Sequence, residues 1–142
     1  MIGKKLDADG LARSLNEERS AHTYFVCGAR PGDGPHRLYR VETRDPLDIV
    51  RAFQVGTHAA LSYGVDAHPT VLKEMAMVHA RNPVVPFFAD AAGLKCTFEQ
   101  PVREDFAEFL ESAISEGVEA YAEEGYIAPL VLREGMLRLW WD

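Results

Sequence analysis

Cysteine is scarce in this sequence. Its 142 residues include only Cys27 and Cys96, which lie far apart and form no CxxC pair. A small secreted domain held together by disulfides carries several closely spaced cysteines, so this class of protein is excluded. The expected state is two reduced, buried thiols in a cytoplasmic protein.

Long apolar runs are also missing. No stretch approaches the roughly 20 apolar residues that a membrane-spanning helix needs. The longest apolar patch, residues 83–94, is interrupted by Pro86 and Asp90, and the residues after Lys5 are too polar for a signal peptide. We therefore expect a soluble protein without a membrane partner.

The sequence also lacks the motifs that are typical of catalytic sites. The five histidines show no HExxH and no four-ligand zinc spacing, and no GxSxG elbow presents a nucleophilic serine. The glycines of residues 28–34 lack the Lys-Ser/Thr that ends a P-loop, and they lead into an expected strand rather than a helix. These absences predict no catalytic residue, metal or cofactor, and they favour a protein that is not an enzyme.

The composition is that of a globular protein. Hydrophobic residues make up 47% of the chain and charged residues 26%, which is too apolar for disorder. A length of 142 residues is common for one domain with one core. One globular domain over residues 1–142 is expected, without repeats or linkers.

Charge is distributed unevenly along the chain. Residues 1–96 contain 12 Lys or Arg and 11 Asp or Glu, a net charge of +1, whereas residues 97–142 contain 3 basic and 11 acidic residues, a net charge of −8. A nucleic-acid-binding protein needs a basic surface that displaces counterions. Nucleic acid is therefore excluded as a main partner, and a basic protein becomes the electrostatically favoured one.

Turn residues and apolar spacing predict the order of helices and strands. Asp45-Pro46 is typical of a helix start, Gly64 and Asn82-Pro83 are typical of helix ends, and Gly93 is expected in the left-handed conformation that ends a helix. In the first helix, Leu11 and Leu15 are expected to face inward. The expected helices span roughly 7–19, 45–63, 69–82 and 101–124, with a short helical turn in 84–94; the expected strands span 22–27, 37–43, 95–99, 130–133 and 136–141.

This order separates pairs of strands from groups of helices. Strands 22–27 and 37–43 are joined by a loop rich in Gly and Pro, and strands 130–133 and 136–141 by Glu134-Gly135, so both pairs are expected to be hairpins. Hairpins separated by helices favour an antiparallel sheet. The predicted fold class is α+β, with an antiparallel sheet of about 4–5 strands, in two hairpins, packed against 4–5 helices.

The acidic residues of the expected helix 101–124 fall on one side at 100° per residue. Three explanations stay open: a solvated face, a docking face for a basic partner such as a nuclease or toxin that the protein blocks, and metal binding by glutamate pairs. The docking hypothesis makes the protein a non-catalytic binding module, of inhibitor or immunity type. The carboxylates of this face are Glu104, Asp105, Glu108, Glu111, Glu116, Glu119 and Glu123.

Trp140 and Trp141 are neighbours on an expected strand, so their side chains point to opposite faces of the sheet. One enters the core with Leu137 and Leu139, and the other is available to a partner or to a second copy of the chain in a homodimer. Trp140 joins the acidic face in the predicted partner-binding set, which is Glu104, Glu108, Glu111, Glu119, Glu123 and Trp140.

A small enzyme or a ligand-binding or metal-binding domain is the alternative function. Cys27, His58, His68 and His79 would form its site if the elements that carry them pack together. The alternative explanation is that these histidines are exposed or hydrogen-bonded where they stand.

Overall fold

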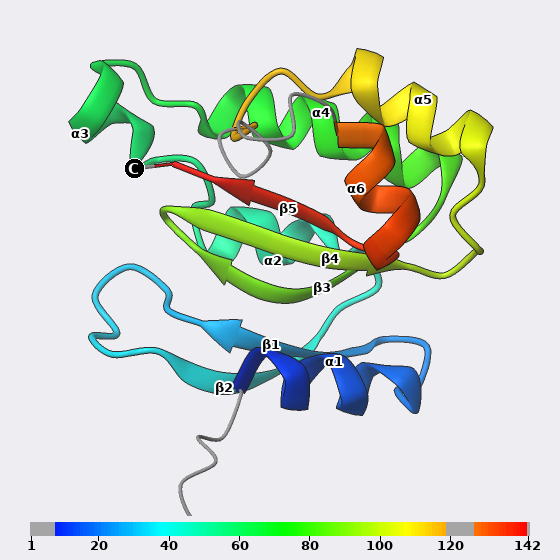
Figure 1. Ribbon diagram of the computed structural model, residues 1–142. Coiled ribbons are helices and arrows are strands. Elements are labelled where there is room, and N and C mark those ends of the chain that lie inside the picture. The colour runs from blue at the N-terminus through cyan, green and yellow to red at the C-terminus, as the bar shows by residue number, and fades with distance from the viewer. Residues whose placement is uncertain (1–7, 119–126, 142) are drawn as a thin grey trace, which may run out of the picture.

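The computed structural model describes residues 8–118 and 127–141, which form six helices and one five-stranded sheet (Figure 1). This confirms the predicted α+β class. The helices are α1 (Ala8–Glu17), α2 (Leu47–Ala52), α3 (Ala59–Tyr63), α4 (His68–Arg81), α5 (Glu104–Ala113) and α6 (Ile127–Glu134). The strands are β1 (Thr23–Gly28), β2 (Arg37–Glu42), β3 (Val84–Asp90), β4 (Gly93–Phe98) and β5 (Leu137–Trp140).

The sheet has the order β2-β1-β3-β4-β5 and is mostly antiparallel. The pairs β1–β2, β3–β4 and β4–β5 are antiparallel, whereas the central pair β1–β3 is parallel, joining Cys27 to Phe88 and Gly28 to Ala89. The parallel pair was not predicted, because β3 reaches β1 only after β2 and three helices. It places the carboxyl ends of β1 and β3 side by side.

Helices cover the two faces of the sheet unequally. Helix α1 lies against β1 and β3 on one face, while α2, α4, α5 and α6 lie on the other (Figure 1). In α1 the buried residues are Ala12 and Asn16, and Leu11 is 41% exposed. The expectation that Leu11 faces inward was wrong, because Ala12 and Asn16 occupy the buried face, whereas Leu15 beside them is half-buried. Among the described residues, no helix combines the length and apolar character required to cross a membrane.

The helix expected over 45–63 is two helices. Asp45 Oδ1 accepts a hydrogen bond from Leu47 N at 3.0 Å, which confirms the expected start, and Gly64 ends α3 with φ 75°. Between α2 and α3, Gln54 adopts φ 50° and Gly56 φ 95°. A Cβ on Gly56 would lie 3.1 Å from His68 N. Glycine at position 56 therefore permits the close packing of this segment on the start of α4, and the predicted helix breaks there.

Residues 84–98 form a β-hairpin, so the helical turn expected in 84–94 was wrong. Every residue of β3 from Val84 to Ala89 is buried, because helices cover both faces of this central strand. A continuous apolar run is typical of such a strand and is ambiguous in sequence. Gly93 is the first residue of β4 and is not left-handed, so the helix-ending conformation expected there was wrong; it pairs with Trp140, where a Cβ would stand 2.8 Å from Trp140 Cε3. The strand expected at 95–99 is confirmed as the end of β4.

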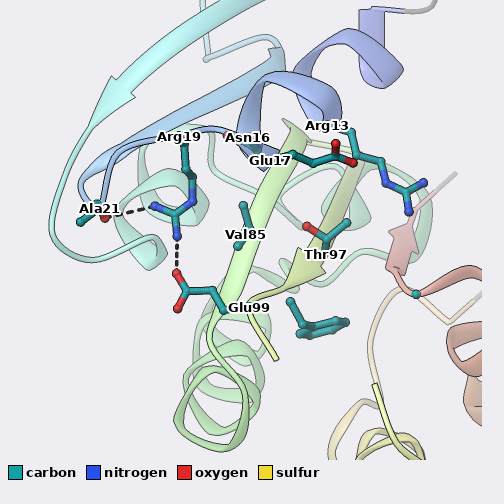
Figure 2. A pocket seen from close by; sticks show the side chains of 10 residues that line it. Arg13, Asn16, Glu17, Arg19, Ala21, Val85, Thr97 and Glu99 are labelled. Carbon is teal, nitrogen blue, oxygen red and sulfur yellow. Dashed lines mark hydrogen bonds and ion pairs between the residues drawn. The ribbon is translucent and has the colours of Figure 1, made fainter. Parts of the chain in front are cut away.

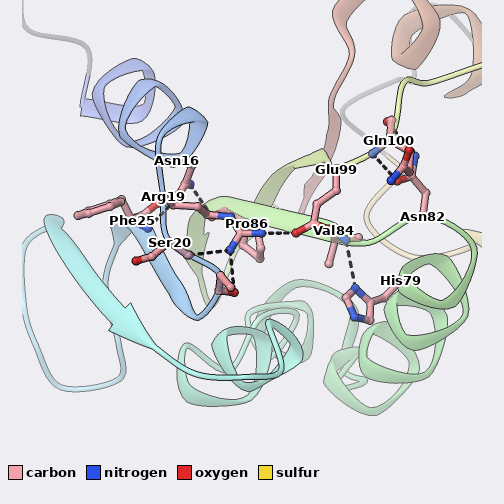
Figure 3. Close-up of polar contacts among 11 residues, drawn as sticks. Asn16, Arg19, Ser20, Phe25, His79, Asn82, Val84, Pro86, Glu99 and Gln100 are labelled. Atoms are coloured by element: carbon pink, nitrogen blue, oxygen red, sulfur yellow. Dashed lines mark hydrogen bonds and ion pairs between the residues drawn. The ribbon is translucent and has the colours of Figure 1, made fainter.

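Proline in a central strand normally leaves a gap in the hydrogen-bond ladder, and here Asn16 of α1 fills it (Figure 3). Pro86 has no N–H to offer Phe25 of β1. The Asn16 amide nitrogen donates to Phe25 O at 2.9 Å and to Pro86 O at 3.2 Å, and Phe25 N donates to Asn16 Oδ1 at 2.7 Å. One buried side chain therefore joins α1, β1 and β3.

The helix expected over 101–124 ends at Ala113, so its predicted length was wrong. Ile114 is extended, with φ −98° and ψ 120°. Glu74 of α4 holds the chain that follows: its carboxylate accepts hydrogen bonds from Ser115 N at 2.9 Å and from Ser115 Oγ at 2.5 Å. A tertiary contact thus overrides the local helical pattern.

The prediction of a terminal hairpin was also wrong, because the residues expected to form its first strand belong to helix α6. Ile127, Leu130 and Val131 are buried at the spacing of one helix face. The expected second strand exists as β5, but it pairs with β4. The two hairpins of the fold are therefore β1–β2, which was predicted, and β3–β4, which was not.

Candidate functional site

The carboxylates of the predicted acidic face lie in different environments in the structure. Glu104, Asp105 and Glu108 are exposed on α5, and α5 carries no basic residue. Arg81 of α4 stacks on the Phe109 ring of α5 with its Cζ 4.3 Å from the ring centroid, so a cation from another element does approach this helix. Of the other predicted carboxylates on this face, Glu111 and Glu116 are half-buried, and Glu119 and Glu123 lie outside the described residues.

Glu111 has a structural contact. Its Oε1 accepts a hydrogen bond from Ala128 N at 2.9 Å, at the second position of α6. A carboxylate at a helix N-terminus satisfies a free backbone N–H and interacts favourably with the helix dipole. Glu111 therefore connects α5 to α6, and reversal of its charge would disturb the fold as well as any partner contact.

The two tryptophans lie on opposite faces, as their alternation predicts. Trp141 is 2% exposed and packs in the main core with Leu137 and Leu139. Trp140 is 41% exposed at the edge of the sheet. Its backbone N donates to Gly117 O at 3.0 Å, which ties the segment after α5 to the end of β5.

A cleft of 290 Å³ opens beside these tryptophans, and we call it the edge cleft. It lies between α3, the start of α4, residues 115–118 and the end of β5. Among the described residues, its charged side chains are Asp66 and Glu116, and none of its lining residues is Lys, Arg or His. The lining residues are Ala59, Tyr63, Val65, Asp66, Ala67, Thr70, Ser115, Glu116, Gly117, Val118, Trp140 and Trp141.

The edge cleft is bordered by large apolar side chains that reach solvent. Val65 is 69% exposed, Tyr63 52% and Val118 38%. Leu61, on the same short helix as Tyr63, is 81% exposed. Single exposed apolar residues are ordinary, but several grouped around a hollow are typical of an interaction surface.

The cleft wall also contains an unsatisfied donor. The indole N–H of Trp141 is buried, and no described residue accepts a hydrogen bond from it. A buried donor without an acceptor costs about 1–3 kcal/mol of stability. Gly117, with φ 69°, packs directly on this ring, because a Cβ there would lie 2.8 Å from Trp141 Cζ2.

The side chains of the alternative site have separate environments. His68 Nδ1 bonds with Val55 O at 2.7 Å, and His79 Nδ1 accepts from Val84 N at 3.1 Å (Figure 3). Cys27 is buried in the small cluster under α1. The hydrogen bonds of His68 and His79 thus go to two separate backbone groups rather than to each other. Within residues 8–118 and 127–141, no three His, Cys, Asp or Glu side chains are placed to hold a metal ion.

The second cysteine is equally enclosed. Cys96 is fully buried in β4, and burial raises the pKa of its thiol to about 12. The thiolate is the reactive form of cysteine, so a thiol with so high a pKa is a poor nucleophile at neutral pH. Both cysteines are free thiols, as expected.

A second hollow is a groove of 570 Å³ between α1 and the sheet (Figure 2). Arg13 and Arg19 lie at opposite ends of it in this view, with Glu99 beside Arg19. Arg19 is held by an ion pair with Glu99, by the carbonyls of Ser20 and Ala21, and by the Tyr24 ring, 4.2 Å from its Cζ. Because the Arg19 donors already bond to groups within the protein, this groove is a weaker candidate for a binding site than the edge cleft.

Sequence reasoning missed most of the edge cleft. It identified Trp140 and Glu116, but it assigned the residues around Gly64 to a helix end and nothing more. The available signal was the run of large apolar residues in this polar turn, Leu61, Tyr63 and Val65. Comparison of the chain with protein-family models, with curated proteins and with solved structures found no match to any of them.

Proposed function

We propose that this chain is a non-catalytic protein-binding module whose edge cleft receives a segment of a basic partner protein. The observation that carries the proposal is the lining of the cleft. In the part of the chain that the structure describes, this lining combines exposed apolar side chains with the carboxylates of Asp66 and Glu116 and contains no basic residue. An apolar centre with a charged rim is the usual anatomy of a protein interface.

The energetic roles of the two parts differ. Burial of Tyr63 and Val65 against a partner's apolar side chain removes apolar surface from water and supplies most of the affinity. The carboxylates select a segment that carries Lys or Arg beside its apolar anchor. The net charge of −8 on residues 97–142, including exposed Glu104 and Glu108 of α5, speeds the encounter with a cationic protein.

An inhibitor or immunity-type role follows when the partner's basic surface is its working surface. A nuclease binds its substrate through Lys and Arg side chains. An acidic protein seated on those side chains excludes the substrate by charge and by volume. The proposal therefore names a cationic protein, such as a nuclease or toxin, as the occupant.

A paired substitution at the cleft tests this function. Tyr63→Ala combined with Val65→Ser removes two exposed apolar contacts, and we expect at least a tenfold loss of partner recovery in pulldown from the native host, measured by quantitative mass spectrometry. Loss of an interface anchor commonly costs more than about 1 kcal/mol of binding free energy. Recovery should also fall when the salt concentration rises, because exposed charges are screened.

Leu132→Ala is the matched control. Leu132 is 42% exposed on α6 and does not line the cleft. Trp140 is less suitable, because its ring packs against Gly93 and its removal would also affect the sheet. Equal recovery of the same cationic protein by the paired variant and by Leu132→Ala would refute docking at the cleft. A stable dimer in light scattering that the paired variant abolishes would instead identify a second copy as the occupant.

A further inference from the structure

Strand β2 forms one edge of the sheet, and in the described part of the chain no strand pairs with its outer side (Figure 1). Its residues follow the β1 register without a shift, include no proline and are exposed or half-buried. A regular, exposed edge strand presents N–H and C=O groups to which another strand can hydrogen-bond. This edge lies at the opposite end of the strand order from β5 and the edge cleft.

The pairing with β1 shows which backbone groups of β2 point outward. Thr43 N donates to His22 O at 2.8 Å, and these two residues stand opposite each other when the β1–β2 register is continued by one pair. Residues of an antiparallel strand turn their backbone groups alternately to one side and to the other. The odd-numbered residues of β2 therefore bond to β1, and the even-numbered ones turn their N–H and C=O groups outward. These are Leu38, Arg40 and Glu42.

The hydrogen bonds of Phe25 give the same alternation independently. Phe25 stands opposite Arg40 in the β1–β2 register. Its N–H and C=O bond to the side chain of Asn16, on the side of β1 away from β2. The pair of Phe25 and Arg40 thus exchanges no backbone hydrogen bond, so the backbone groups of Arg40 point to the outer side of β2.

Apolar side chains lie beside this edge on the face that α1 covers. Leu38 stands opposite a β1 residue that packs with Ala12 of α1. Arg13 reaches Met136 next to β5, so Leu11, on the other side of Ala12 around the helix, lies toward β2. Leu11 and Leu38 are each 41% exposed. They provide apolar surface that a partner at this edge can bury.

The charges of the outward-facing residues are self-complementary. Arg40 and Glu42 carry opposite charges on the same face of the strand, and each side chain is 66% exposed. When β2 pairs antiparallel with β2 of a second copy about a two-fold axis, each face of the sheet continues across the pair. Residues that stand opposite each other must then lie on the same face. The axis therefore passes through a residue and not between two residues.

An axis through Val41 gives the best match of charge. Arg40 of each copy then stands opposite Glu42 of the other copy, and both residues have outward backbone groups that can bond across the pair. An axis through Arg40 would instead set two arginines against each other, and an axis through Tyr39 would set Arg40 against Leu38. Opposite charges on facing residues stabilise an antiparallel pair, and like charges destabilise it.

We propose that the protein forms a two-fold dimer in which the β2 strands of two copies pair antiparallel about Val41. Edge charges usually keep strands apart, but here the alternation of sign allows them to meet in opposite pairs. A strand pair of this length is a small interface, so Leu11 and Leu38 add the apolar contact beside it. The dimer leaves the edge cleft of each copy open, and it does not depend on the docking proposed for that cleft.

Charge-swapped variants test the register of this dimer. Arg40→Glu and Glu42→Arg each set like charges opposite each other, and each is expected to raise the dimer dissociation constant about tenfold or more in analytical ultracentrifugation. An equimolar mixture of the two variants is expected to form heterodimers, because every facing pair is again opposite in charge. The double variant Arg40→Glu/Glu42→Arg is expected to dimerise as the unaltered chain does.

Arg133→Glu is the matched control. It makes the same change of net charge as Arg40→Glu, at a side chain of α6 that is 66% exposed. This variant and Tyr63→Ala/Val65→Ser are both expected to leave the dimer unchanged, which separates it from docking at the edge cleft. Urea denaturation checks that each variant is folded.

Amide hydrogen exchange reads the strand pairing directly. The amides of Arg40 and Glu42 are expected to exchange more slowly as the protein concentration rises, whereas those of Tyr39 and Val41 are protected at every concentration. The proposal is overturned if the protein stays monomeric at every concentration reached or if the mixed charge-swapped variants do not associate. Equal weakening by Arg133→Glu, or a dimer whose Arg40 and Glu42 amides exchange freely, would overturn it too.

Discussion

Gly28→Ala is expected to destabilise the protein by more than about 3 kcal/mol, because the central strands leave no room for a methyl group. A Cβ at position 28 would stand 1.8 Å from the backbone oxygen of Ala89. The obstacle is the backbone of a buried strand, so no side-chain rotation relieves the clash. Strands β1 and β3 would have to separate at the pair that makes them parallel neighbours.

Urea denaturation measures this effect, with the free energy of unfolding taken by linear extrapolation. Gly32→Ala is the control: φ at Gly32 is 83°, but nothing lies within 4 Å of its Cβ position. That variant is expected to lose only about 1 kcal/mol, the cost of a left-handed conformation for alanine. A Gly28→Ala protein as stable as Gly32→Ala would contradict the close approach of β1 and β3.

Asn16→Ala is expected to cost about 3 kcal/mol. The substitution removes the side chain that bonds to Phe25 N, Phe25 O and Pro86 O. Each buried backbone group left without a partner costs about 1–3 kcal/mol, although water can enter at the more exposed end of the gap. Pro86 has no N–H and therefore cannot replace the lost bonds.

Hydrogen exchange gives the local readout for Asn16. The Phe25 amide should lose its protection in Asn16→Ala, while Ser14→Ala, on the exposed side of the same helix, should leave both exchange and stability unchanged. Asn16→Asp separates the two functions of the amide, because it keeps the acceptor for Phe25 N and loses both donated bonds. Retained protection of Phe25 in Asn16→Ala would show that β1 and β3 do not need this bridge.

Local signals predicted those parts of the fold that local forces determine. The β1–β2 hairpin follows from its Gly- and Pro-rich loop, and α4 ends where Asn82-Pro83 predicts. The predictions were wrong where contacts with residues far away in the sequence determine the local structure. Helix α5 stops where Glu74 holds Ser115, and beside Pro86, which has no N–H, the donor to Phe25 O is the side chain of Asn16. No pattern within either segment indicates its distant partner.

The candidate sites show the same division. The alternation of Trp140 and Trp141 was readable from the strand period, and exposed Glu104 and Glu108 lie where helical spacing placed them. The edge cleft combines residues 59–70, 115–118 and 140–141, which lie far apart in the chain, so no local pattern reveals it.

Selection of random peptides on the immobilised protein tests the edge cleft most directly. The selected peptides are expected to carry a large apolar residue flanked by Lys or Arg, to bind more weakly at high salt, and to lose about tenfold in affinity for the Tyr63→Ala/Val65→Ser variant but not for Leu132→Ala. Selected peptides that show no excess of basic residues, or that bind the paired variant as tightly as the unaltered chain, would contradict the proposed docking of a basic partner.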